Sequence, residues 1–197
     1  MNLTTSGDGA DTVVVLVRHA HAQWTPDERR PLSERGRIDA ERLAAGLVHC
    51  PVEAVYASSA TRAQETVAPI AATLDLPVKV VDDLRERKLS GEPVDDWLAA
   101  VRATWDDASF VWPGGESNQA AQCRGVRAVE AIVAAHPGQY VVVATHGNLL
   151  ALIIQQYDRS IDFAFWRALS MPDAYRLRYG SNGIQYEKFV WADKPIG

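Results

Sequence analysis

The sequence predicts an α/β protein built as a three-layer sandwich, with a mainly parallel central sheet and helices on both faces. Three observations lead to this expectation. Strand and helix patterns alternate along most of the 197 residues. Two strand segments, "TVVVLVR" (12–18) and "QYVVVATHG" (139–147), contain the continuous apolar runs of strands buried on both faces. The tail, "AYRLRYGSNGIQYEKFV", alternates around an "SNG" turn, which is a hairpin signal.

The first half of the chain supplies three strands and two helices. The expected strands are 12–18, 54–58 and 78–84. The expected helices are 33–50 and 59–75. Ser33 is a suitable N-cap for the first helix, and Ile38, Leu43 and Leu47 are placed on one apolar stripe of it. Pro69 lies inside the second helix and is expected to bend it.

The second half begins with an irregular segment at 85–118, which is interpreted as a lid. It contains a short helix at 94–107 and the turn "WPGGES". The elements expected after it are a helix at 117–136, a strand at 139–147, a helix from 148 and the hairpin at 174–190. Because parallel strands put ligands beyond their carboxyl ends, that edge of the sheet is where a site is expected.

Composition places the chain among ordinary mildly acidic soluble proteins. Its formal net charge is -5 and 47% of its residues are hydrophobic, which gives enough apolar surface for one core. We expect a disordered leader at 1–12 and a single domain at 13–197. No basic excess favours nucleic acid, and no run reaches the about 18 apolar residues of a membrane span. Two cysteines without metal spacing suit a reduced, cytoplasmic protein.

Basic residues follow several of the predicted strands. Arg18 and His19 end one strand, His146 ends another, and Arg62 lies in the first turn of the helix after a third. A guanidinium group can donate two parallel hydrogen bonds to two oxygens of one phosphate group. The helix expected to start near Ser59 would direct its first N–H groups at the same phosphate. These residue types at one sheet edge predict a site for a phosphoryl group.

A histidine beside arginines is suited to nucleophilic catalysis. The neighbouring positive charges lower the pKa of the imidazole and leave it neutral. A neutral imidazole in line with a bound phosphate can form a phosphohistidine, which water then hydrolyses. The alternative for a lone histidine at a strand end is a purely structural role. The combination of His19 and His146 with Arg18 favours function.

Six segments of the chain resemble the histidine phosphatase (phosphoglycerate mutase-like) superfamily, in that family's order. They are "LVRHAHAQW", "RPLSERGRIDAERLA", "VYASSATRAQETVAPIA", "LRERKLSG", "WPGGES" and "VVVATHGNLLALI", within about 13–155. The short bacterial phosphatases of the family are the most similar type. Each segment alone is unspecific, whereas six in register at suitable spacing are a strong signal.

The resemblance implies roles for individual residues. His19 corresponds to the phosphorylated nucleophile, and Arg18, Arg62 and His146 correspond to its phosphate pocket. Glu86, in "LRERK", corresponds to the proton donor for the leaving group.

Three further positions are assigned to substrate binding: Thr25, His21 and Gly147.

The sequence departs from the family pattern at three places. Ala20 replaces the glycine after the Arg-His pair, and Thr25 stands where mutases carry an asparagine. The stretch after Glu86 lacks the usual aromatic-Gly-x-Trp-Glu pattern, so "DDLRERK" is open to a second interpretation as a charged surface turn. These departures bear on one phosphate contact and on the proton donor.

The function expected from the resemblance is hydrolysis of a small phosphorylated metabolite through a phosphohistidine. Three alternatives stay open: a phosphoglycerate mutase, a phosphohistidine-protein phosphatase and a catalytically silent binding module. We expect no cofactor and no metal ion, because the sequence has no carboxylate cluster with metal-ligand spacing. Neither a nucleic acid nor a membrane is an expected partner. The sequence does not decide the oligomeric state, a homodimer being one alternative.

Overall fold

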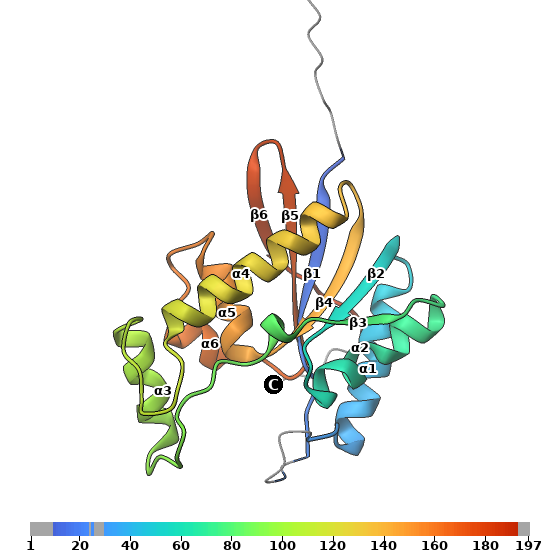
Figure 1. The fold of residues 1–197 in the computed structure, drawn as a ribbon. Coiled ribbons are helices and arrows are strands. Elements are labelled where there is room, and N and C mark those ends of the chain that lie inside the picture. Colours follow the sequence, from blue (N-terminus) through green and yellow to red (C-terminus); the bar gives the residue numbers. More distant parts are fainter. Residues whose placement is uncertain (1–9, 24, 26–29, 193–197) are drawn as a thin grey trace, which may run out of the picture.

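The computed structural model describes residues 10–23, 25 and 30–192. Its centre is a six-stranded sheet with the strand order β3-β2-β4-β1-β5-β6. Most of the expected leader lies outside the described residues, and Thr12 already belongs to the first strand, where it is buried. The expected α/β fold is confirmed, with helices on both faces of the sheet (Figure 1).

The elements follow the expected order, with shifted ends. The strands are β1 (Thr12–Arg18), β2 (Val52–Ala57), β3 (Val78–Val80), β4 (Tyr140–Thr145), β5 (Asp173–Gly180) and β6 (Gly183–Lys188). The helices are α1 (Glu34–Leu47), α2 (Thr61–Thr73), α3 (Trp97–Asp106), α4 (Asn118–Ala135), α5 (Gly147–Gln155) and α6 (Phe163–Ala168), with a 3-10 helix, η1 (Asp82–Leu84).

The sheet is mixed. The strands β3, β2, β4 and β1 run parallel, whereas β5 is antiparallel to β1 and pairs with β6 in the expected hairpin. Alternate residues of β1 bury into two cores. Val15 and Val17 face α1 and α2, while Val14 and Leu16 face α4 and α5 (Figure 1). Because both faces are covered, β1 is apolar throughout, as its sequence predicts.

For the first expected helix, the prediction of the N-cap is confirmed, and the prediction that Ile38 belongs to the buried stripe is wrong. Ser33 accepts a hydrogen bond from the Gly36 backbone N–H and caps α1. Leu43 and Leu47 are fully buried, whereas the Ile38 side chain is 49% exposed. The buried stripe runs through Ala40 instead, at the spacing of four and three residues that keeps side chains on one helical face.

The strand expected at 78–84 is shorter than predicted. It ends at Val80, and residues 82–84 turn into η1. Aspartates favour such local turns over a ladder, because their side chains compete for backbone hydrogen bonds. Asp82 and Asp83 therefore end the strand, while Leu84 is fully buried behind them. This turn directs the following residues, including Glu86, toward the carboxyl edge of the sheet.

One helix starts later than expected, and one helix was not expected at all. The helix expected from residue 59 begins at Thr61, and no side chain caps it. The short helix α6 was not predicted, although Asp162 carries the signal for it by accepting a hydrogen bond from the Phe165 N–H. None of the helices in the described part of the chain has the length and apolar character needed to cross a membrane.

Candidate active site

Three adjacent parallel strands deliver polar residues to one edge of the sheet. His19 directly follows β1, His146 follows β4, and Ser58 follows β2. The His19 N–H donates to the Thr145 carbonyl and the Ser58 N–H to the Ala144 carbonyl, which extends the strand ladder by one residue. As a result, the rings of His19 and His146 meet edge to face with centroids 5.1 Å apart. The two histidines do lie at the same sheet edge.

The tautomer of His19 follows from its hydrogen bonds. Nδ1 lies 2.7 Å from the Ala20 carbonyl oxygen, which can only accept, so Nδ1 carries the proton. Nε2 therefore holds a lone pair. The backbone N–H of Ala20 is in turn held by Thr66 Oγ1 at 2.9 Å, which fixes the carbonyl that orients the ring.

Arg62 lies between the two imidazoles. Its Nε donates to His19 Nε2 over 3.3 Å, and its Nη2 lies 3.2 Å from His146 Nδ1. Because a guanidinium has no acceptor, Nδ1 of His146 holds a lone pair as well. The Nε2–H of His146 then donates to Ser58 Oγ at 2.8 Å. The Ala20 carbonyl and the Arg62 guanidinium thus set the tautomers of the two histidines, and Ser58 takes the remaining proton of His146.

Both imidazoles are held neutral. Burial lowers the pKa of His19 to about 3, and the charges of Arg62 and Arg18 add to this effect against the Ala20 hydrogen bond. Burial also lowers the pKa of His146 well below its ordinary value, assisted by His19 and Arg62. A neutral imidazole with a free Nε2 is the form in which histidine is a nucleophile.

These depressed pKa values predict a stability change with pH. Between pH 6.5 and about 3, unfolded His19 binds a proton that native His19 does not. Stability therefore falls as the pH falls through this window, by at most about 1.4 kcal/mol per pH unit for each such histidine. Urea unfolding of His19→Gln at pH 7, 6 and 5 in phosphate-free buffer should show a shallower loss than the wild type. The exposed His49 provides the control: His49→Gln should retain the wild-type slope. Equal slopes for all three proteins would contradict the buried neutral state.

The Arg18 side chain is held by backbone carbonyls of the segment that follows α6. Its Nη1 donates to the Leu169 carbonyl at 2.7 Å and to the Ser170 carbonyl at 3.4 Å. Its Nε is buried without a hydrogen-bond partner in the described structure. A Cβ on Gly147 would lie 2.9 Å from that Nε, so the glycine allows the guanidinium to approach α5. Gly147 therefore makes room for Arg18.

Glu86 accepts hydrogen bonds at the N-terminus of α5. Its Oε2 accepts from the Asn148 N–H at 2.9 Å, and its Oε1 accepts from the N–H groups of Leu149 at 3.0 Å and Arg87 at 2.9 Å. The N–H groups of Asn148 and Leu149 belong to the first turn of α5 and have no partner within the helix. Of the two interpretations of "DDLRERK", the charged surface turn is wrong for Glu86, which is half-buried and faces the site.

A cavity of about 540 Å³ opens in front of these residues. Its wall includes His146, Arg62, Glu86 and the first turn of α2 from Ser59 onward. No side chain caps α2, and its first residues Thr61 and Arg62 belong to the cavity wall, so the first turn of α2 is available to an anion there. His19 and Arg18 are not part of this wall, and the half-buried His19 contacts both Arg62 and His146, which are.

Two of the expected substrate-binding residues, His21 and Thr25, are not part of the cavity wall. His21 is exposed, and its Nδ1 is hydrogen-bonded to Ser33 Oγ at 2.8 Å. Thr25 is half-buried, and its neighbours lie outside the described residues. Their assignment to substrate stays a prediction.

Sequence reasoning missed Ser58 and Arg87. Ser58 is fully buried and orients His146. Its signal was its position immediately after β2, the same signal that identified His19 and His146. Arg87 is buried in the cavity wall, and nothing in "LRERK" distinguishes it from an exposed arginine. Among the described residues, no group of three or more His, Cys, Asp or Glu side chains could hold a metal ion.

The mixed sheet, together with paired imidazoles and arginines at its carboxyl edge, is characteristic of phosphoglycerate mutase-like α/β enzymes. The chain belongs to the histidine phosphatase superfamily (branch 1), whose family model matches residues 14–192.

Curated relatives include both phosphatases and mutases. A metal-independent phosphoserine phosphatase of Arabidopsis thaliana is 33% identical over an alignment of 161 residues, and the match covers 72% of this chain and 67% of that protein. A 2,3-bisphosphoglycerate-dependent phosphoglycerate mutase 2 of Gloeobacter violaceus is 31% identical over an alignment of 173 residues, and the match covers 74% of this chain and 75% of that protein.

Solved structures show the same fold. A mycobacterial glucosyl-3-phosphoglycerate phosphatase, in complex with inorganic phosphate, is 25% identical with a TM-score of 0.72, covering 91% of this chain and 96% of that one. A phosphoserine phosphatase of Entamoeba histolytica gives a TM-score of 0.75 at 15% identity, covering 91% and 97%. The latter likeness concerns the fold alone.

Proposed function

We propose that this histidine phosphatase superfamily member is a metal-independent phosphomonoesterase that hydrolyses a small phosphorylated metabolite through a phosphohistidine. The observation that carries the proposal is the state of His19. Its Nδ1–H is bound to the Ala20 carbonyl, its Nε2 lone pair is oriented by Arg62, and its pKa is lowered to about 3. A nucleophile in this state needs no separate base to deprotonate it.

The reaction has two displacements. In the first, Nε2 of His19 attacks phosphorus, the P–O bond to the leaving group breaks, and the leaving oxygen takes a proton. The positive charge that develops on the imidazole is shared with Ala20, which accepts from Nδ1–H. In the second, water attacks phosphorus, the N–P bond breaks, and His19 returns to its neutral form with inorganic phosphate as product.

The charge of the transferred group is balanced by fixed donors. Arg62 is close to both imidazoles, and the uncapped first turn of α2 faces the same cavity. Preorganised donors of this kind stabilise the charge that spreads over the phosphoryl oxygens in transfer. His146 is buried and neutral, so it adds no charge to the site, and its hydrogen bond to Ser58 fixes its orientation.

A phosphoglycerate mutase-type transfer is the second candidate, because the Gloeobacter violaceus relative is named as such a mutase. Both reactions pass through a phosphohistidine and differ in the acceptor. A phosphatase passes the group to water, whereas a mutase returns it to a phosphoglycerate. Incubation with 3-phosphoglycerate and analysis of the products separates them, since only hydrolysis releases inorganic phosphate in proportion to substrate lost.

The direct test is hydrolysis of p-nitrophenyl phosphate in excess chelator, combined with quenching in alkaline detergent and detection of protein-bound phosphate. We expect unchanged turnover in chelator and a phosphoryl group that is labile to acid and stable to base, as phosphoramidates are. Complete loss on chelation that magnesium restores, or the absence of bound phosphate under single-turnover conditions, would contradict the mechanism.

Glu86 is proposed as the proton donor to the leaving oxygen, and Glu86→Gln tests this role. Alkyl phosphates, whose leaving groups need a proton, should lose about 10²-fold in kcat, while p-nitrophenyl phosphate should change by less than about tenfold. The amide nitrogen of glutamine cannot accept from Asn148, so unfolding should also become easier by about 1–3 kcal/mol. An equal loss of rate on both substrates would assign Glu86 to the support of α5 only.

A further inference from the structure

Glu86 lies on a stretch of chain that belongs to no helix or strand. The 3-10 helix η1 ends at Leu84, and the backbone is extended at Arg85. The last carbonyl groups of a helix have no partner within it, and a buried carbonyl without a donor costs free energy. The position of the Glu86 carboxylate therefore depends on the groups outside this stretch that hold its backbone.

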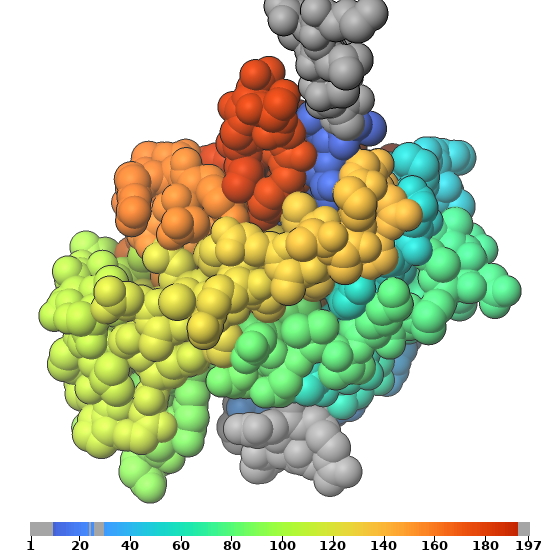
Figure 2. Space-filling model, turned by 45° about the horizontal axis from the view of Figure 1, so that its top comes forward, coloured from blue at the N-terminus to red at the C-terminus, as the bar shows by residue number. Residues whose placement is uncertain are grey.

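Three successive carbonyl groups directly before the proposed proton donor are held by buried side chains from other elements. The Thr145 hydroxyl, at the end of β4, donates to the Leu84 carbonyl at 2.7 Å. The carbonyls of Asp83 and Arg85 accept from Nη1 of a single residue of α4, Arg124, at 2.6 and 3.1 Å. Figure 2 shows α4, in yellow, packed against the green segment that follows β3. One guanidinium nitrogen thus fixes two of these three peptide groups.

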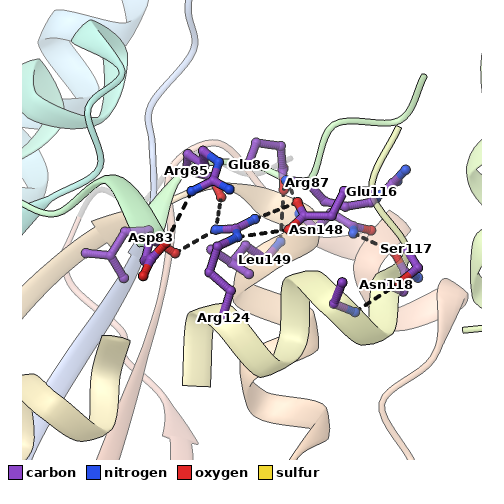
Figure 3. A network of polar contacts seen from close by, with 12 residues as sticks. Asp83, Arg85, Glu86, Arg87, Glu116, Ser117, Asn118, Arg124, Asn148 and Leu149 are labelled. Atoms are coloured by element: carbon purple, nitrogen blue, oxygen red, sulfur yellow. Dashed lines mark hydrogen bonds and ion pairs between the residues drawn. The ribbon is translucent and has the colours of Figure 1, made fainter. Parts of the chain in front are cut away.

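Two further nitrogens of Arg124 bind Glu116, as Figure 3 shows. Nε and Nη2 donate to the two carboxylate oxygens at 3.0 and 2.7 Å, the parallel arrangement that suits a guanidinium. The Arg124 and Glu116 side chains are 7% and 20% exposed, so the pair is largely removed from water. Glu116 provides the counter-charge that a buried guanidinium needs, because an unpaired buried cation is strongly destabilising.

Glu116 also holds the chain on the other side of Glu86. Its N–H donates to the carbonyl of Lys88, shortly after Glu86, at 2.7 Å. Further along, the Gly91 N–H donates to the Pro113 carbonyl at 2.7 Å. The two ends of the expected lid therefore run side by side, and the guanidinium–carboxylate pair connects them to α4.

We propose that Arg124 is a positioning residue, which acts on the reaction by holding the proton donor Glu86 at the leaving oxygen, with Glu116 as its fixed counter-charge. The proposal rests on the phosphatase function and on the role of Glu86 in it. Arg124 and Glu116 are not part of the cavity wall, so Arg124 acts through the backbone before Glu86 and not on the substrate. A shift of that backbone moves the carboxylate, whereas His19 and Arg62 are positioned by β1 and α2. A displacement of about 1 Å at a reacting group can cost about 10²-fold in rate.

A double-mutant cycle between Arg124 and Glu86 tests this role. The variants are Arg124→Met, Glu86→Gln and the two combined, each assayed with an alkyl phosphate and with p-nitrophenyl phosphate. Because the aryl leaving group departs without a proton, the ratio of the two kcat/KM values reports the proton donor. The control is Arg127→Met, at an exposed position of the same helix.

Arg124→Met should lower kcat/KM for the alkyl phosphate about 10- to 100-fold and for p-nitrophenyl phosphate by less than about threefold. In the Glu86→Gln background, the same substitution should leave the alkyl-to-aryl ratio unchanged, because the donor that it would displace is already absent. Arg127→Met should behave as the wild type on both substrates.

Stability is separated from positioning by a variant that removes both charges. Arg124→Met leaves the Glu116 carboxylate without its partner, so its thermal midpoint should fall. Glu116→Gln combined with Arg124→Met should have a higher midpoint than Arg124→Met alone, with an equally low alkyl-to-aryl ratio, because the two carbonyls still lack their donor. If Arg124→Met does not fold, this double variant carries the test. A ratio that recovers together with the midpoint would show a role in stability alone and overturn the proposal.

Equal losses on both substrates, or no loss on either, would also overturn the proposal. So would a further fall of the ratio in the Glu86→Gln background, because Arg124 would then act through another group.

Hydrogen exchange distinguishes failure of this inference from failure of the function. Absence of p-nitrophenyl phosphate turnover by the wild type would reject the phosphatase function itself. The N–H groups of Asn148 and Leu149, which donate to Glu86, would still report its position. Relative to the N–H groups of β4, they should exchange about tenfold or more faster in Arg124→Met than in Arg127→Met. Unchanged exchange would overturn the positioning role alone.

Discussion

Replacing His19 by alanine should lower the turnover of both aryl and alkyl phosphates by about 10⁴-fold or more, because the covalent step has no other nucleophile. The ring is the only imidazole of the pair whose Nε2 lone pair faces Arg62, since the His146 Nε2 proton is donated to Ser58. Steady-state release of phosphate from p-nitrophenyl phosphate and from an alkyl phosphate measures the effect. Protein quenched in alkaline detergent should carry phosphate in the wild type and none in the variant.

The matched control for this variant is His49→Ala. His49 is exposed in the turn that precedes β2, at the amino end of the strand, whereas the site lies at the carboxyl end. It should retain wild-type turnover and phosphate labelling. Circular dichroism and thermal unfolding verify that His19→Ala is folded. A folded His19→Ala protein that still becomes phosphorylated would move the nucleophile to another residue.

Replacing Arg62 by alanine should lower kcat/KM about 10³-fold for every phosphomonoester, irrespective of the leaving group. Arg62 donates to Nε2 of His19 and lies 3.2 Å from Nδ1 of His146. Its loss removes a donor to the phosphoryl oxygens and also the group that orients both rings. Because the effect concerns the transferred group, aryl and alkyl substrates should be affected equally, in contrast to Glu86→Gln.

Arg62→Lys separates charge from geometry. A lysine retains the positive charge but has no planar fork with which to reach two rings, so we expect it to recover only part of the loss. The exposed Arg127→Lys is the control and should be neutral. Rates measured on p-nitrophenyl phosphate and on an alkyl phosphate give the comparison. Full activity in Arg62→Lys would show that only charge is needed at this position.

Much of the fold follows from local sequence patterns. The apolar runs of β1 and β4 are long enough, and rich enough in valine, that burial on both faces is their only favourable environment. The start of α1 was also predictable from a local feature, because the Ser33 hydroxyl oxygen is within reach of the N–H groups of the first turn. The expectations that failed concerned Ile38, Asp82 and Asp83, where small differences in helical angle or turn preference decide the outcome.

The presence of a site was also predictable, because strand direction fixes where side chains meet. The parallel alignment of β1 and β4 brings His19 and His146 to one edge whatever else the chain does. Residue type then limits the ligand, since arginines beside neutral imidazoles suit a phosphoryl group.

Only the tertiary structure decides how those residues are used. The tautomers of His19 and His146 depend on Ala20, which follows β1, and on Ser58 and Arg62 at the junction of β2 and α2. In the same way, the three N–H donors at Glu86 depend on α5 beginning where the turn after β3 ends.

For Arg87, sequence and structure differ most. Within "LRERK" its side chain has the same local sequence environment as that of Arg85, yet Arg85 is exposed beside Asp82, while Arg87 is buried with no hydrogen-bond partner at Nε and Nη1. Burial is a property of the surface that long-range packing encloses, and α4 encloses this one through Arg124. The sequence by itself determined the fold class and the edge of the sheet where the candidate site lies. Tertiary packing decided which arginine is buried in the cavity wall, because no local pattern specifies this.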